Sequence, residues 1–284
     1  MPDKKNTYQN WRYLGAAILI FCVMLVADNY FDSPRPDDGL GLSETELTVL
    51  IDELDRSKID RDHTVNQIPD FTRFSSVIEK KRAFFAYLLP EIDRQNEITL
   101  TLRKAIHAMQ SQIAVEQPLT PFAKRLLTRL RKSYRVDENL DNKHALVVLS
   151  IRVDIIPPEL VLVQAANESG WGTSRFARKG YNFFGLWCFT KGCGFIPRQR
   201  DEGTVHEVAK FSSLSNAVKT YIRNLNRHYA YQELREIRSQ LRQQNKPVTA
   251  RALVHGLHSY SERGQDYIDE LVSMMRVNEK HMNL

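Results

Sequence analysis

The stretch 157-PPELVLVQAANESGWGTSRFARKGYNFFGLW-187 decides how the chain folds around its most informative residue, Glu168. Its two prolines predict a helix start, because proline fits the first helical turn and disfavours helix in the residue before it. An apolar run then leads to Glu168, and glycines end the helix directly after it. Leu160, Gln164 and Glu168 recur at a spacing of four, so they share one face of this helix.

The setting of Glu168 predicts a proton donor. Small apolar residues and a tryptophan beside it would remove water from the carboxyl group and raise its pKa. A carboxyl group that stays protonated near neutrality suits a general acid, which cleavage of a glycosidic bond requires at the leaving oxygen. The alternative is a helix-end glutamate that only bonds to backbone. Aromatic residues that can stack on sugars or form core follow it: Trp171, Tyr181, Phe183, Phe184 and Trp187. We expect Phe183 or Phe184 to be buried in either case.

The N-terminus has the pattern of an export signal. Lys4, Lys5 and Arg12 precede an uncharged apolar run over residues 13–27. This run is either a cleaved signal or a retained inner-membrane anchor, and both predict a periplasmic protein with the basic end left behind. A buried helix of a cytosolic protein is the remaining alternative.

Composition and cysteine positions indicate which classes of partner and which cellular compartment suit the protein. The 284-residue chain has a formal net charge of +6, which favours anionic surroundings such as a cell-wall polymer, a membrane surface or nucleic acid. It contains neither a phosphate-binding loop nor a dinucleotide fingerprint, and we predict no nucleotide, nucleic acid, cofactor or metal. Cys22 lies in the apolar run. Cys188 and Cys193 can close a small loop as a disulfide or remain two free thiols.

Helical periodicity dominates the chain, with one segment that departs from it. A helix is predicted from about residue 74 to 112, which Pro90 should kink or split, and others begin after caps at Thr120 and Ser215. Glycines and short alternating runs over residues 188–213 predict a β-hairpin. The fold class is therefore α+β, mainly helical with a small β-lobe. The predicted parts are a basic segment 1–12, a signal or membrane anchor 13–27, a linker 28–42, a helical region 43–140 and a catalytic domain 141–284.

The run QAANESGWGTSRFARKGYNFFGLW resembles the bacterial peptidoglycan N-acetylglucosaminidases related to autolysins and to the flagellar peptidoglycan hydrolase. Their motif reads roughly AQAALESGWGTS followed by NLFGIK. With EKKRAFFAYLLP upstream and NRHYAYQELREIR downstream, the whole chain resembles the Bax-type branch of that family. The resemblance covers about residues 143–275. It implies a lysozyme-like α+β fold and an endo-beta-N-acetylglucosaminidase that acts on peptidoglycan glycan strands.

The resemblance carries over residue by residue. Glu168 matches the family's catalytic acid, and the asparagine, phenylalanine and glycine of NFFG match the segment that shapes the cleft floor. Tyr221 matches a tyrosine on the helix after the hairpin, and Tyr260 with Tyr267 resembles a late pair of tyrosines that flank a turn. Of these tyrosines we favour Tyr260 as the catalytic one that reaches the substrate. The residues implied for substrate binding are Trp171, Asn182, Phe184, Gly185, Tyr221 and Tyr267.

The second catalytic group stays open. Related enzymes place a glutamate in the hairpin, in a segment like TTEYENG, whereas this chain reads PRQRDEG with Gln199 at that position. Asp201, Glu202 and Glu207 are candidates, and the substrate's own acetamido group is another. Three readings therefore remain: hydrolysis, a lytic transglycosylase reaction that uses a glutamate–serine pair, and glycan binding without cleavage.

Overall fold

The structure, a computed structural model, describes residues 39–54, 68–197, 206–282 and 284. Residues 39–284 form one compact unit. The apolar run predicted as a signal or anchor at residues 13–27 lies outside the described residues. Within the described ranges, no helix is both long and apolar enough to cross a membrane.

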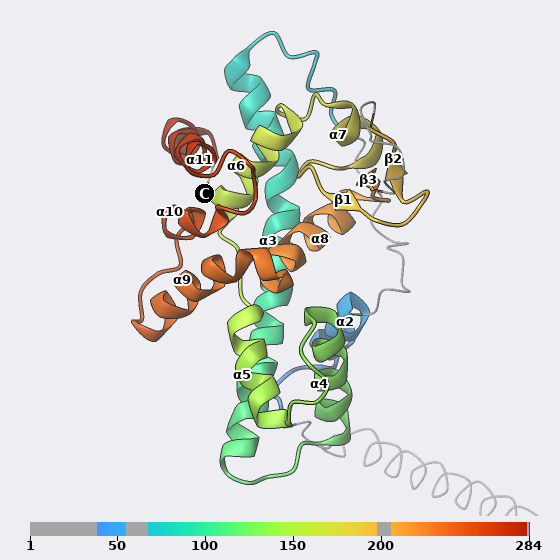
Figure 1. The fold of residues 1–284 in the computed structure, drawn as a ribbon, viewed down its shortest axis with the longest axis vertical. Helices are drawn as coiled ribbons and strands as arrows, with labels where there is room; N and C mark the ends of the chain where they lie inside the picture. The colour runs from blue at the N-terminus through green and yellow to red at the C-terminus, as the bar shows by residue number, and fades with distance from the viewer. Residues whose placement is uncertain (1–38, 55–67, 198–205, 283) are drawn as a thin grey trace, which may run out of the picture. The chain divides into compact units, whose positions relative to one another are not determined.

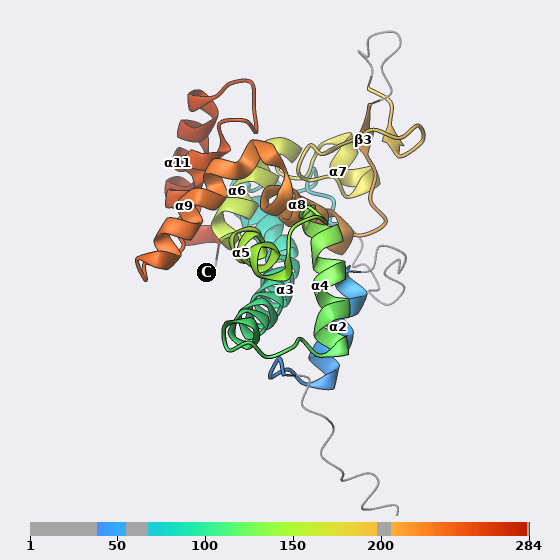
Figure 2. The ribbon, with the colours of Figure 1, turned by 60° about the horizontal axis from the view of Figure 1, so that its bottom comes forward.

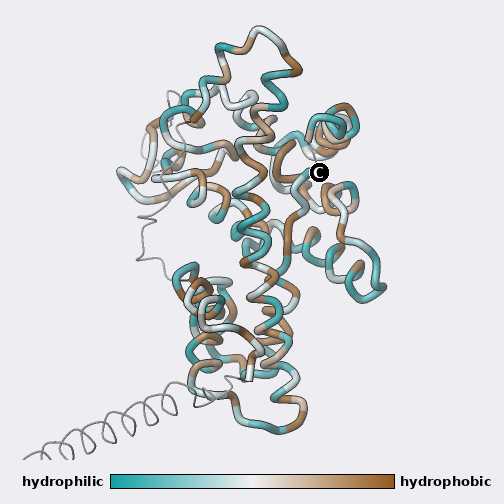
Figure 3. The backbone as a smooth tube through the Cα atoms, turned by 180° about the vertical axis from the view of Figure 1, so that it is seen from behind, coloured by the Kyte–Doolittle hydropathy of each residue, from teal (hydrophilic) through white to brown (hydrophobic). Residues whose placement is uncertain are grey.

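Helices make up most of the described chain, and a small antiparallel sheet accompanies them, so the fold class is α+β (Figure 1). Hydrophobic and hydrophilic residues are interspersed along the chain (Figure 3). The α-helices are α2 (Glu44–Leu54), α3 (Val77–Ala114), α4 (Pro121–Tyr134), α5 (Asn142–Arg152), α6 (Pro158–Ser169), α7 (Arg175–Gly180), α8 (Leu214–Arg227), α9 (Gln232–Gln243), α10 (Ala250–Leu253) and α11 (Gln265–Asn278). Short 3-10 helices are Tyr229–Tyr231, Val254–Leu257 and Glu279–His281.

The longest helix, α3, contributes to two hydrophobic cores. Phe84 and Phe85 in its first half pack into the core that contains α6, whereas Leu102 and Ile106 in its second half pack with α2, α4 and α5. Figure 2 shows α5 beside α3. Pro90 lies inside α3 without splitting it, so of the two predicted effects, a kink or a split, the split is wrong. Burial of apolar residues on both sides of Pro90 outweighs the one backbone hydrogen bond that proline cannot make.

The predicted domain boundary at residue 140 does not separate the two hydrophobic cores, because each core contains residues from both sides of it. Phe71 and Phe84, well before the boundary, belong to the core of α6, α8 and α11. Leu146 and Leu149 of α5, after the boundary, belong to the core of α2 and α4. The catalytic domain of residues 141–284 therefore stays a prediction, and the helical region before it supplies part of its core.

Local capping signals place most helix starts. Thr120 caps α4, as predicted. The cap of α8 is Ser213 and not the predicted Ser215, because Ser213 Oγ accepts from the backbone N–H of Asn216 at 3.1 Å. Ser215 Oγ instead accepts a hydrogen bond from the Arg94 guanidinium of α3 at 2.6 Å. Both serines lie at the start of the same helical run, so sequence alone did not distinguish them.

The predicted hairpin is formed by β2 (Gly194–Phe195) and β3 (Glu207–Ala209). A third strand, β1 (Trp187–Cys188), also pairs with β3, so β3 lies in the middle of an antiparallel sheet with the order β1-β3-β2. A Cβ atom at Gly194 would lie 2.0 Å from the carbonyl oxygen of Val208, so the close approach of β2 to β3 requires glycine there. Two residues are too few for an alternating pattern to reveal β1 in the sequence.

Candidate active site

Glu168 lies in the last turn of α6, whose residues 160–166 are all buried. Gly170 ends the helix in a left-handed conformation at φ 56°, and the Trp171 N–H donates to the carbonyl oxygen of Ala166 at 2.8 Å. The chain therefore turns away directly after the carboxylate. As a result, Glu168 is half-buried, although the preceding turns of α6 lie in the core.

A buried chain of hydrogen bonds ends on Glu168. The Tyr267 hydroxyl of α11 donates to Glu168 Oε1 at 3.0 Å. Gln164, one turn earlier on α6, donates from Nε2 to the Tyr267 hydroxyl oxygen at 3.0 Å. Its Oε1 accepts from the hydroxyl of Tyr221 on α8. Three helices thus orient one carboxyl group.

Gly185 lies beside the other carboxyl oxygen of Glu168, Oε2. Its φ is +62°, and a Cβ atom there would lie 3.0 Å from Glu168 Oε2, so glycine allows the backbone to run beside the carboxyl group. Asn182 holds this turn through hydrogen bonds of 2.9 to 3.0 Å. Its Nδ2 donates to the carbonyl oxygens of Leu186 and Ala209, and its Oδ1 accepts from the Leu186 N–H. Asn182 therefore ties the turn to β3.

Aromatic rings pack around this turn. The Tyr260 hydroxyl donates to the carbonyl oxygen of Phe184 at 2.8 Å, and its ring stacks on that of Tyr267 with 5.7 Å between ring centres. Phe184 stacks on Tyr221 at 4.1 Å. Phe184 and Phe183 are both buried, which fulfils the expectation for this pair. The tyrosine that contacts Glu168 is Tyr267, whereas the hydroxyl of Tyr260 is engaged by backbone.

Burial raises the pKa of Glu168, and neighbouring groups act in both directions. The Tyr267 hydrogen bond lowers this pKa by stabilising the ionised carboxylate, the charge of Glu270 raises it, and Arg263 lowers it. Arg263 and Glu270 form an ion pair of 2.7 Å, which lowers the pKa of Glu270. The pKa of Glu168 is thus raised beside a Glu270 whose pKa is lowered.

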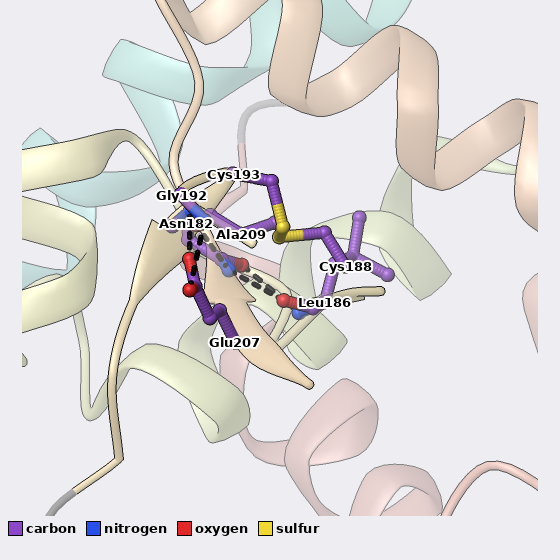
Figure 4. The surroundings of a disulfide bond; sticks show 8 residues. Asn182, Leu186, Cys188, Gly192, Cys193, Glu207 and Ala209 are labelled. Atoms are coloured by element: carbon purple, nitrogen blue, oxygen red, sulfur yellow. Dashed lines mark hydrogen bonds between the residues drawn. A yellow bond between two sulfur atoms is a disulfide. The ribbon is translucent and has the colours of Figure 1, made fainter. Parts of the chain in front are cut away.

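The β-lobe is held by a disulfide and by Glu207. Cys188 and Cys193 are bonded, so the disulfide alternative is confirmed (Figure 4). Glu207 is buried, and its oxygens accept from the N–H groups of Gly192 at 2.9 Å and Gly194 at 2.8 Å. Both carboxylate oxygens of Glu207, a candidate for the second catalytic group, are therefore hydrogen-bonded to the backbone of the β-lobe.

The other candidates, Asp201 and Glu202, lie outside the described residues, as does Gln199. In the described part of the chain, one group brings three potential metal-ligand atoms within 4.8 Å of one another, namely Cys188, Cys193 and Glu207. Its two sulfurs are bonded to each other, which removes the thiolates that would bind a metal.

The two tryptophans of the opening stretch have different surroundings. Trp171 packs edge to face on Phe84 at 5.6 Å and on Phe85 at 5.4 Å, which ties the end of α6 to α3. Trp187 is 49% exposed and follows Gly185 by two residues. The Trp187 ring packs edge to face on the ring of His206, with 5.0 Å between ring centres.

The Glucosaminidase family, described as mannosyl-glycoprotein endo-beta-N-acetylglucosaminidase, matches residues 143–280. Protein bax of Escherichia coli (strain K12) is 35% identical over 216 residues, which are 76% of this chain and 76% of that protein. The chain is a Bax-type member of the glucosaminidase family. No solved structure matches it.

In this Bax-type member of the family, the matched range 143–280 contains every hydrogen bond described around Glu168. It leaves out α3, although Phe84 and Phe85 of that helix support Trp171. Helix α3, which precedes residue 140, therefore helps to support the end of α6.

Sequence reasoning missed two contributions to the site. Gln164 was placed on the face of Glu168, but its link to Tyr267 was not foreseen. Glu270, whose charge acts on Glu168, was not considered. Glu270 follows Tyr267 by three residues, so the two side chains share a face of α11. This spacing points to Glu270 only once Tyr267 is known to reach Glu168.

Proposed function

We propose that this protein is an exported peptidoglycan hydrolase of the endo-beta-N-acetylglucosaminidase type, with Glu168 as the general acid. The arrangement of Glu168 carries the proposal: its pKa is raised by burial, Oε1 bonds to Tyr267, and Oε2 lies beside Gly185. Membership of the glucosaminidase family supports glycoside hydrolysis as the class of reaction. Peptidoglycan glycan strands are the proposed substrate.

In the proposed reaction, Glu168 gives its proton to the glycosidic oxygen while the bond from that oxygen to the anomeric carbon breaks. Water then adds its hydroxyl group to the anomeric carbon and releases a proton, so that the acid can be restored. Tyr267 stabilises the carboxylate that proton transfer creates, because hydrogen bonds to ionised groups are stronger than neutral ones. Asp201, Glu202 or the acetamido group of the substrate supports the anomeric centre.

Substrate contacts are proposed for the exposed surface around Gly185. Trp187 provides a flat, half-exposed ring for a sugar face. Asn182, Phe184 and Tyr221 are buried, so their proposed role is to hold the floor beneath the substrate.

Export to the periplasm is part of the proposal. The basic residues before the apolar run at 13–27 support an export signal or an inner-membrane anchor. The disulfide between Cys188 and Cys193 suits an oxidising compartment, and the positive net charge suits an anionic polymer.

Digestion of purified cell wall by the full chain, followed by mass spectrometry of the fragments, tests the proposed activity. The expected products end in reducing N-acetylglucosamine. Fragments with anhydro ends, lighter by one water, would instead indicate a lytic transglycosylase. Binding to the wall without released fragments at any pH would indicate a glycan-binding protein.

A further inference from the structure

The hydrogen bonds that end on Glu168 have one consistent direction when its carboxylate is ionised. An ionised carboxylate only accepts, so the single hydroxyl hydrogen of Tyr267 goes to Oε1. Tyr267 then accepts from Gln164, which turns the amide nitrogen toward Tyr267 and the amide oxygen toward Tyr221. Tyr221 is fully buried and donates to that oxygen.

A proton on Oε1 competes with the hydrogen of Tyr267. If Oε1 donates to the Tyr267 oxygen instead, the displaced Tyr267 hydrogen has no acceptor unless the Gln164 amide turns its oxygen toward it. Reversal turns the Gln164 amide nitrogen toward Tyr221, whose hydroxyl has no other hydrogen bond among the described residues. A buried donor without an acceptor is unfavourable, so protonation at Oε1 is penalised.

A proton on Oε2 leaves the whole arrangement unchanged. Oε2 has no hydrogen bond in the described part of the chain, and it lies beside the exposed Gly185, where a Cβ atom would be 3.0 Å away. The oxygen that can take the proton without reversing the buried bonds is thus the one that faces the proposed substrate side.

We propose that Gln164 is a positioning residue that assigns the proton of Glu168 to Oε2. Through its amide, Gln164 links the buried hydroxyl of Tyr221 to that of Tyr267 and so commits the Tyr267 hydrogen to Oε1. The proton is then delivered to the glycosidic oxygen from Oε2, on the Gly185 side. This inference rests on the proposed role of Glu168 as the acid.

Other charged and titratable groups face Glu168 without distinguishing its two oxygens. Glu270 and Arg263 act through their charges, and Tyr260 and Tyr231 lie close enough for the charge of Glu168 to raise their pKa. None of these four groups makes a hydrogen bond to Glu168 in the described residues. The Gln164–Tyr267 pair is therefore what sets the two oxygens apart.

Substitution of Tyr221 by phenylalanine tests the proposal at a hydroxyl that does not touch Glu168. In Tyr221→Phe, protonation of Oε1 no longer leaves a buried hydroxyl unpaired, so either oxygen can take the proton. The pKa of Glu168 should therefore rise, by at most about 0.3, because a second equivalent site doubles the proton affinity. Gln164→Met should raise it as well, because Tyr267 loses its donor. Tyr267→Phe should give the largest upward shift and sets the scale, since the hydrogen bond to the carboxylate is gone.

The measurement is a carbon-13 NMR titration of the glutamate carboxyl groups in the full chain, with the Glu168 resonance assigned from Glu168→Gln. Tyr87→Phe is the matched control, because it also deletes a buried phenol hydroxyl, one that has no hydrogen-bond partner among the described residues. An upward shift in Tyr221→Phe and Gln164→Met, absent in Tyr87→Phe, supports the proposal. A titration of Glu168 in Tyr221→Phe that equals wild type overturns it.

The titration does not depend on activity, so the two proposals fail separately. Loss of the proposed function would appear as absence of cell-wall digestion by wild type, while the NMR titration would still decide the role of Gln164. If wild type digests cell wall, the limb of its pH profile at higher pH reports the loss of the Glu168 proton. This limb should move to higher pH in Tyr221→Phe and stay in place in Tyr87→Phe.

Discussion

Replacement of both Cys188 and Cys193 by serine should lower the free energy of unfolding by about 2 kcal/mol. The bond joins residues at a sequence separation of five, and closing so short a loop removes about 2 kcal/mol of chain entropy from the unfolded state. The backbone hydrogen bonds to Glu207 remain in the folded protein. The β-lobe should therefore stay folded, and cell-wall digestion should continue under mild conditions.

Guanidinium unfolding followed by circular dichroism measures this loss. Cys22→Ser is the matched control, since it removes a thiol that takes no part in the disulfide, and it should leave the unfolding free energy unchanged. A loss in the double variant below about 0.5 kcal/mol, the usual range of neutral surface substitutions, would refute the loop-entropy argument. Loss of digestion in a folded double variant would refute the view that the disulfide acts mainly on the unfolded state.

Two further substitutions test the surroundings of the acid. Glu270→Gln removes a charge that raises the pKa of Glu168, so that pKa should fall, and the limb of the digestion profile at higher pH should move to lower pH; an unchanged or opposite shift contradicts this. Trp187→Ala should raise KM about two- to tenfold with kcat preserved, as expected for one lost aromatic contact. Phe189→Ala, which removes a neighbouring exposed ring, is its control, and equal effects from both would argue against a specific role for Trp187.

The position of Glu168 could be predicted because it depends on local signals. Proline starts and glycine ends α6, and the spacing of apolar residues identifies the buried helix that carries the carboxyl group. The asparagine and glycine of NFFG were identified by family resemblance, and the structure gives both a physical role. Asn182 ties the turn to β3, and Gly185 leaves room for the carboxyl group.

The partners of Glu168 could not be predicted because they are brought together over long distances in sequence. Tyr267 lies 99 residues from Glu168 and 103 from Gln164, and no local pattern encodes that encounter. The same limit explains why Pro90 does not split α3, since tertiary burial on both sides of the proline maintains this helix. Local rules identify which element carries a residue, whereas packing decides what that residue meets.

Comparison of Glu168→Gln with wild type in the digestion of purified cell wall tests the central claim most directly. Loss of a general acid should lower the rate of fragment release by about 100- to 10,000-fold. Burial raises the pKa of Glu168, so ionisation of this carboxyl group at neutral pH destabilises the folded protein. The glutamine variant does not ionise, and near neutral pH it should therefore unfold at a higher temperature than wild type. This difference in unfolding temperature should vanish in acid. A folded Glu168→Gln protein that releases fragments at the wild-type rate would contradict the assignment of Glu168 as the catalytic acid.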